Sequence, residues 1–100
     1  MARMRFEIVL SPEADKGFRD LHDHLRAAVR DALETHLRFE PTKASKSRVK
    51  RLRGMKRPQY RLRVDEVRIY YDVTENTVDV LAIVSKSRAQ AWLEEKGERS

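Results

Sequence analysis

The chain is predicted to adopt an α+β fold, in which a small antiparallel β-sheet packs against an N-terminal helical hairpin. Three observations predict it. A short alternating pattern near the N-terminus precedes a long helical pattern. Two alternating patterns and a nearly all-apolar run then follow one another between residues 60 and 84, and a helical pattern ends the chain. The element order is therefore β-α-α-β-β-β-α. The 100 residues suit one domain over residues 1–100.

The first strand and the first helix meet at a clear boundary. Phe6, Ile8 and Leu10 alternate with more polar neighbours, which predicts a strand. Ser11 then supplies a hydroxyl cap, and Pro12 fits the first helical position. A helix therefore begins directly after the strand.

Apolar residues continue at helical spacing as far as Pro41, through Ala14, Phe18, Leu21, Leu25, Val29, Ala32, Leu33, His36 and Leu37. Either one long helix or a hairpin bent near residues 22–26 satisfies this spacing. A single helix would be about 40 Å long at 1.5 Å per residue, which is more than a domain of this size can cover. The hairpin is therefore favoured.

A three-stranded meander is expected after a connector over residues 42–58, part of which can also pair as strand. Apolar side chains alternate along its first two strands, at Tyr60, Leu62, Val64, Val67, Ile69, Tyr71 and Val73. Residues 77–84 are nearly all apolar, which predicts a central strand buried on both faces. A last helix, capped by Ser85 or Ser87, ends at Gly97.

The basic residues are concentrated in one quarter of the chain. The whole chain has 22 Lys and Arg residues against 16 Asp and Glu residues. Between Glu40 and Asp65 there are ten basic residues and no acidic one, whereas acidic residues outnumber basic ones elsewhere. Eight of the ten lie in the connector: Lys43, Lys46, Arg48, Lys50, Arg51, Arg53, Lys56 and Arg57. This concentration favours a polyanion as the binding partner, and nucleic acid is the first candidate.

Several classes of site are excluded by what the chain lacks. Without cysteine there is no disulfide, no Cys-ligated zinc and no thiol nucleophile. His22 and His24 do not share a helix face, and His36 is expected to pack, so no metal or other cofactor is expected. The chain has no apolar stretch long enough to span a membrane and no convincing secretory signal. We therefore expect a soluble, cytoplasmic domain with no membrane partner.

The strand pattern brings three arginines together. Arg61 and Arg63 lie on the same face of their strand, and an antiparallel neighbour adds Arg68. Lys86 and Arg88 follow the last strand and are expected to close the patch from its end. Guanidinium groups bind phosphate bidentately. Alternatively, these side chains form ordinary ion pairs with Asp65, Asp72, Asp79, Glu94 and Glu95.

The combined pattern resembles the RelE/ParE superfamily of bacterial type II toxins. The resemblance is carried by Arg51-Leu52-Arg53-Gly54, by Tyr60-Arg61-Leu62-Arg63-Val64, and by Val67-Arg68-Ile69-Tyr70-Tyr71-Asp72-Val73. The apolar strand over residues 77–85, the chain length and the element order also agree. No single motif is diagnostic, but the three together are fairly specific.

The resemblance implies a partner and an activity. The partner is a cognate antitoxin that wraps the toxin and masks its basic face. RelE-like members are ribosome-dependent endoribonucleases that cut mRNA without metal, which implies the ribosome and mRNA as further partners. Carried over to this chain, the catalytic set comprises Arg61, Arg63, Arg68, Lys86 and Arg88. The eight basic residues of the connector would then bind RNA.

Two departures from the RelE pattern leave alternatives open. RelE-like enzymes commonly have lysines where Arg61 and Arg63 stand, and a catalytic Tyr or His near the C-terminus, whereas this chain has neither Tyr nor His after Tyr71. Guanidinium is a poor general base, so proton transfer is left to a lysine or a carboxylate: Lys50, Lys56, Lys86, Glu66 or Asp72. A ParE-like gyrase inhibitor without nuclease activity, or a non-catalytic relative, remains the alternative function.

Overall fold

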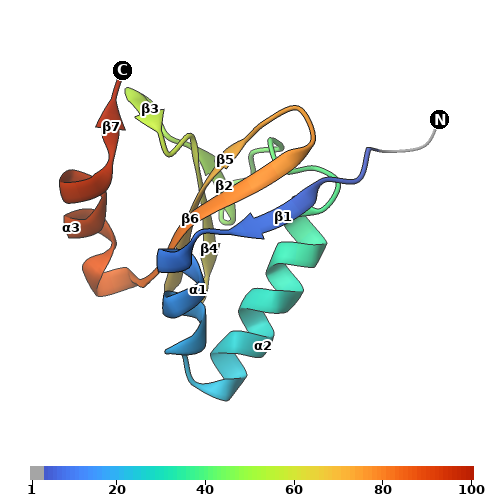
Figure 1. Cartoon of the computed structure of the whole chain (residues 1–100), viewed down its shortest axis with the longest axis vertical. Coiled ribbons are helices and arrows are strands. Elements are labelled where there is room, and N and C mark those ends of the chain that lie inside the picture. Colours follow the sequence, from blue (N-terminus) through green and yellow to red (C-terminus); the bar gives the residue numbers. More distant parts are fainter. Residues whose placement is uncertain (1–3) are drawn as a thin grey trace.

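The computed structural model describes residues 4–100 and has a five-stranded sheet with helices on both faces (Figure 1). The strands of this sheet lie in the order β1-β6-β5-β4-β2. Their bounds are β1 (Glu7–Leu10), β2 (Val49–Arg51), β4 (Tyr60–Val64), β5 (Val67–Val73) and β6 (Thr77–Ser85). The helices are α1 (Pro12–Arg19), α2 (Asp23–Ala32) and α3 (Lys86–Lys96), and α2 continues into a π-helical turn, η1 (Leu33–Leu37).

The predicted α+β fold and its element order are confirmed, with two differences in the sheet. β1 pairs with β6 in parallel, whereas β2, β4, β5 and β6 pair antiparallel, so the sheet is mixed. A second, two-stranded sheet joins β3 (Met55–Arg57) to β7 (Glu98–Arg99), which lie side by side at the C-terminal end in Figure 1.

The helical hairpin is confirmed, and its first helix begins where the sequence places it. The Ser11 hydroxyl accepts a hydrogen bond from the Ala14 N–H at 3.0 Å and donates one to the Leu81 carbonyl at 2.9 Å. Ser11 therefore caps α1 and ties it to β6 at the same time. The helical pattern ends at Leu37, earlier than Pro41, which instead lies buried in the following loop.

The core lies between the hairpin and one face of the sheet, which we call the inner face. Val29, Leu33 and Leu37 of the helical segment pack with Leu62 and Ile69 of the sheet. The same cluster includes Val49, which anchors the basic connector as β2. Burial of this apolar surface is the main force that holds the hairpin against the sheet.

The strand that is buried on both faces is β5, and the prediction for residues 77–84 is wrong on this point. β6 is an internal strand, but its burial alternates along its length. β5 is central in the sheet and is buried continuously from Val67 to Tyr71. The reason is α3, whose Trp92 stacks on Tyr70 with ring centroids 5.0 Å apart and so covers the outer face of β5.

A buried hydrogen bond fixes the loop that leads from the hairpin to β2. The Tyr71 hydroxyl donates to the Pro41 carbonyl at 2.7 Å, and both residues are buried. Burial raises the pKa of the Tyr71 phenol well above its usual range, so the phenol stays protonated and remains a donor. This bond connects the centre of the sheet to the start of the basic connector.

We therefore expect Tyr71→Phe to lower the free energy of unfolding by about 1–3 kcal/mol, because it leaves the Pro41 carbonyl buried without a donor. Tyr60→Phe is the matched control, since Tyr60 stacks on Tyr71 at 5.4 Å but its hydroxyl has no hydrogen bond to residues 4–100. Urea unfolding of the two variants measures the difference. Equal stabilities would contradict this role for the Tyr71 hydroxyl.

Candidate functional site

Three arginines lie together on the outer face of the sheet, which is the face opposite the hairpin. β4 and β5 pair with Arg63 directly opposite Arg68 and with Arg61 opposite Tyr70. Residues that are directly opposite in an antiparallel pair project from the same face. We call Arg61, Arg63 and Arg68 the arginine cluster. Their common face was predicted from strand alternation, and the observed register confirms it.

The strand β2 extends this row of positive charge. Lys50 pairs with Arg61 in the β2–β4 register, and the Arg63 N–H donates to the Arg48 carbonyl at 2.9 Å. The basic connector is therefore attached to the sheet by backbone pairing. Its central part is an edge strand that places Lys50 next to Arg61.

Arg68 is the buried member of the cluster. Only 7% of its surface is exposed, and its Nη1 donates to the carbonyls of Asp65 at 2.8 Å and Val67 at 3.0 Å. Burial lowers the pKa of the Arg68 guanidinium, and the positive charges of Arg63 and Arg61 lower it further. Arg68 therefore stays charged at neutral pH, but in surroundings that disfavour its charge.

The cluster has no carboxylate partner within residues 4–100, so the ion-pair alternative is wrong for these three arginines. Asp72 pairs instead with Arg57, at 3.3 Å from Nε to Oδ2, and accepts the Gln59 N–H at 2.8 Å. Burial raises the pKa of the Asp72 carboxyl, and these two contacts oppose that rise. No ion pair within residues 4–100 therefore neutralises the cluster.

A groove of about 630 Å³ opens beside the cluster, between α3 and the edge of the sheet. Its charged lining consists of five basic residues, Lys50, Arg51, Arg53, Arg61 and Arg99, and one acidic residue, Glu94. The Arg61 Nε atom is buried and, within the described part of the chain, has no hydrogen-bond partner. A buried donor without an acceptor is costly, and an anion in the groove would satisfy it.

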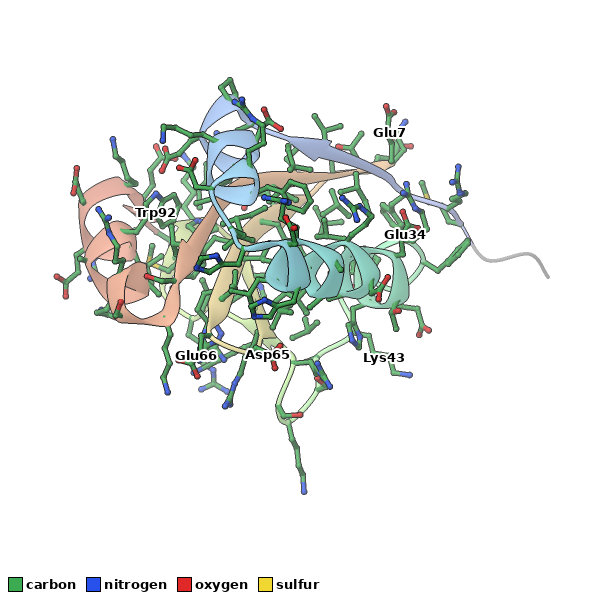
Figure 2. The ribbon with its side chains drawn as sticks, turned by 90° about the horizontal axis from the view of Figure 1, so that it is seen from below. Glu7, Glu34, Lys43, Asp65, Glu66 and Trp92 are labelled. Carbon is green, nitrogen blue, oxygen red and sulfur yellow. The ribbon has the colours of Figure 1, made fainter. Side chains whose placement is uncertain are left out.

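A second hollow of about 580 Å³ lies at the β4–β5 turn, on the other side of Arg63. It is lined by Ser47, Arg48, Arg63, Asp65 and Glu66. Basic and acidic side chains thus face one hollow here. Figure 2 shows Asp65 and Glu66 at an edge of the molecule where several nitrogen-tipped side chains project.

Lys86 and Arg88 take different positions. Lys86 begins α3, and its N–H donates to the Glu66 carbonyl at 2.7 Å, so its backbone lies at the β4–β5 turn. Arg88 lines a hollow of about 340 Å³ between α1 and α3, together with Glu13 and Trp92. The structure therefore brings Lys86 to the end of the cluster and places Arg88 toward α1.

All eight basic residues of the connector have exposed side chains. Three of them have local contacts: Lys43 with Glu40, Arg57 with Asp72, and Arg51, whose guanidinium lies 5.2 Å from the centre of the Tyr60 ring. The other five, Lys46, Arg48, Lys50, Arg53 and Lys56, form no ion pair with residues 4–100. The connector therefore adds accessible positive charge along the β2 edge.

Two features of the site were not expected from the sequence, the covering of Tyr70 and the strand β7. Tyr70 lies beside Arg61 but is only 3% exposed, and its hydroxyl donates to the Ala89 carbonyl at 3.4 Å. The strand β7 brings Arg99 to the groove. A strand of two residues has no periodicity to detect, whereas the alternation along β5 did place Tyr70 on the outer face. Trp92 anchors α3 by stacking on Tyr70, and its indole N–H donates to Glu13 at 2.5 Å.

The histidines lie on the hairpin side of the molecule. The rings of His22 and His24 stack with centroids 6.2 Å apart, so the expectation that they lie on different faces is wrong. The reason is that His22 is the N-cap of α2 and lies outside the helical spiral. His36 is half-buried, and burial lowers the pKa of its imidazole.

Neither a metal site nor a membrane span is found among residues 4–100. No group of three or more His, Asp or Glu side chains in this part of the chain is arranged to hold a metal ion. None of its helices has the length and apolar character needed to cross a bilayer.

Comparison with known proteins gives one family and several similar structures. A family model described as the ParE toxin of the type II toxin–antitoxin system parDE matches residues 8–90. A comparison with curated proteins finds no match.

Among solved structures, the chain is similar to the RelBE2 toxin–antitoxin complex from Mycobacterium tuberculosis, with a TM-score of 0.64 and 20% identity over 82% of this chain and 99% of that chain. It is also similar to the RelE–RelB complex from Pyrococcus horikoshii, with a TM-score of 0.64 and 23% identity over 85% and 99% of the two chains. It is similar as well to the YoeB dimer from Staphylococcus aureus, with a TM-score of 0.56 and 15% identity over 78% of this chain and 93% of that chain. These similarities confirm the fold.

The surroundings of Arg68 lead to a prediction about stability. In Arg68→Met an apolar side chain of similar length replaces a buried cation that two other cations repel. We expect the free energy of unfolding to change by no more than about 1 kcal/mol, because relief of buried charge repulsion offsets the loss of the hydrogen bonds to the Asp65 and Val67 carbonyls. Arg63→Met is the control, because Arg63 lies exposed opposite Arg68. This substitution should change the free energy of unfolding by less than about 0.5 kcal/mol. A loss of more than about 2 kcal/mol in Arg68→Met, measured by urea unfolding, would show that Arg68 is needed for folding.

Proposed function

The chain belongs to the ParE toxin family of type II toxin–antitoxin systems, and from its arginine cluster we propose that it is a ribosome-dependent endoribonuclease that cuts mRNA. A cognate antitoxin is its partner, as in any type II system. The ribosome and mRNA are the further partners of the proposed reaction.

One observation carries the proposal, and it is the arginine cluster, whose members form no ion pair. Arg61, Arg63 and Arg68 share one face, and none of them pairs with a carboxylate of residues 4–100. Cleavage of RNA by its own 2′-hydroxyl passes through a phosphorane with extra negative charge, which preorganised cations stabilise. Arg63, the exposed member of the cluster, borders the hollow at the β4–β5 turn and supplies such a cation. The unpaired Nε of Arg61 supplies a donor in the neighbouring groove for another phosphate of the same RNA.

The basic connector supports RNA as the polyanion. Its exposed side chains continue the positive charge from the cluster along β2. Contacts of this kind bind phosphates without reading sequence, and their affinity falls steeply with salt. Docking on ribosomal RNA would use this surface, and the messenger would then lie across the cluster.

A second candidate function is that of a gyrase inhibitor without nuclease activity. The observation that favours it is the absence of an accessible Tyr or His at the cluster, within the described residues. Tyr70 is covered by Trp92, and the three histidines lie on the hairpin. A non-catalytic relative that only binds its antitoxin is the third candidate.

Arg61→Ala should abolish growth arrest on induction and leave antitoxin binding intact, because it removes a donor from the cluster without touching the core. Arg30→Ala, on the helix that covers the inner face, is the matched control and should remain toxic. Colony counts after induction and co-purification with the antitoxin measure the two properties. Full toxicity of Arg61→Ala would mean that the cluster is not used.

Mapping of transcript 5′ ends after induction separates the proposed functions. The proposal predicts new 5′ ends at fixed positions within codons of translated messages, because the ribosome holds the codon that is cut. A gyrase inhibitor would instead cause gyrase-dependent DNA breaks in a supercoiling assay and leave transcripts uncut. Growth arrest with uncut transcripts would overturn the proposed nuclease activity.

A further inference from the structure

The arginine cluster can stabilise a charged transition state, but it cannot accept a proton. Guanidinium stays protonated at any ordinary pH, whereas attack by a 2′-hydroxyl requires a base to take its proton. The sequence leaves five candidates for this base, which are Lys50, Lys56, Lys86, Glu66 and Asp72. Their surroundings in the structure differ, and the differences select one of them.

Asp72 is held away from the reaction by its own contacts. One of its oxygens accepts the Gln59 N–H and the other pairs with Arg57. Its side chain is 16% exposed, and it lies four residues along β5 from Arg68, which is about 13 Å at the usual rise of a strand. Asp72 therefore organises the far end of the strand.

The three lysines carry the wrong charge for the task. An ammonium group accepts no proton until it has lost one, whereas a carboxylate is already a proton acceptor at neutral pH. Lys50 adds its cation beside Arg61, Lys56 lies on β3, and Lys86 begins α3.

Glu66 lies where a base is needed. Its side chain lines the hollow at the β4–β5 turn together with Arg48 and Arg63. Its negative charge also acts on Arg68, where it opposes the lowering of the guanidinium pKa. Glu66 is exposed and forms no ion pair with residues 4–100, so its carboxylate is free to meet a substrate. Figure 2 shows it at the open edge of the molecule.

The backbone around Glu66 is fixed, which a positioned base requires. Its carbonyl accepts the Lys86 N–H at 2.7 Å, so the turn is tied to the start of α3. Asp65, the preceding turn residue, has φ of 49° and a carbonyl held by Arg68. The turn is therefore clamped between α3 and the arginine cluster.

We infer that Glu66 is the general base of the proposed cleavage, in the hollow that it shares with Arg48 and Arg63. Its carboxylate takes the proton of the 2′-hydroxyl, the 2′-oxygen forms a bond to phosphorus, and the bond from phosphorus to the 5′-oxygen breaks. The leaving 5′-oxygen takes a proton from water in the open hollow, and Glu66 returns its proton to solvent. The products are a 2′,3′-cyclic phosphate and a 5′-hydroxyl.

The inference rests on the proposed function. The direction in which one substitution changes the cleavage rate tests it. Glu66→Gln removes a negative charge from a phosphate-binding hollow. If Glu66 only neutralised the arginines, the variant would bind RNA more tightly and cleave it at least as fast. A general base predicts the opposite for the rate, with unchanged or tighter binding and cleavage slowed by about 100-fold or more.

The assay is single-turnover cleavage of A-site mRNA on programmed ribosomes by the full chain freed of antitoxin, with ribosome affinity measured in parallel. Glu75→Gln, in the exposed β5–β6 turn, is the charge-matched control and should cleave like the unmodified chain. Glu66→Ala should regain part of its activity when formate is added, because formate can replace the missing carboxylate, whereas a residue that only shapes the turn gives no such rescue.

The outcomes separate the base from the proposed function. The assignment of Glu66 would be overturned if Glu66→Gln cleaved at the full rate, or if Asp65→Asn slowed cleavage and Glu66→Gln did not. Either result would leave the proposed nuclease activity intact. Failure of the unmodified chain to cleave would overturn the nuclease and the base together.

Discussion

The register between β4 and β5 is the constraint on which both faces of this sheet depend. With Arg63 opposite Arg68, the apolar partners Leu62 and Ile69 meet on the inner face and the guanidinium groups meet on the outer one. A slip of one residue would turn every side chain of a strand to the other face. The packing of the core and the assembly of the cationic cluster are therefore set by one pairing.

The relative size of the energies explains why like charges are held so close together. Like charges directly opposite in a sheet cost about 0.2–1 kcal/mol per pair, whereas burial of one Val, Leu or Ile side chain contributes about 1.5–3 kcal/mol. Leu62, Ile69 and Val67 are each at most 1% exposed. Apolar burial on the inner face thus outweighs repulsion on the outer face, and α3 adds to it by covering β5 with Trp92. The apolar inner face of the sheet therefore holds the cationic outer face in place.

Sequence patterns predicted the features that depend on local periodicity. Alternation along residues 60–73 placed three arginines on one face, and the Ser11-Pro12 boundary placed the start of α1. What the patterns missed depends on contacts between distant elements. The apolar composition of residues 77–84 suggested burial on both faces, but the covering helix lies over β5. The position of Arg88 toward α1 and the pairing of β7 with β3 likewise depend on where α3 lies, which no local pattern of its own residues specifies.

The central claim is that the outer face of β2, β4 and β5 binds an RNA phosphate backbone, and NMR titration of the full chain with a short 2′-O-methylated RNA tests it most directly. The methyl group blocks the nucleophile, so that binding is observed without cleavage. The account predicts shifts at Lys50, Arg61, Arg63, Arg68 and Glu66, with an affinity that falls steeply as salt is raised. Shifts confined to the helical hairpin, or an affinity that is insensitive to salt, would contradict it.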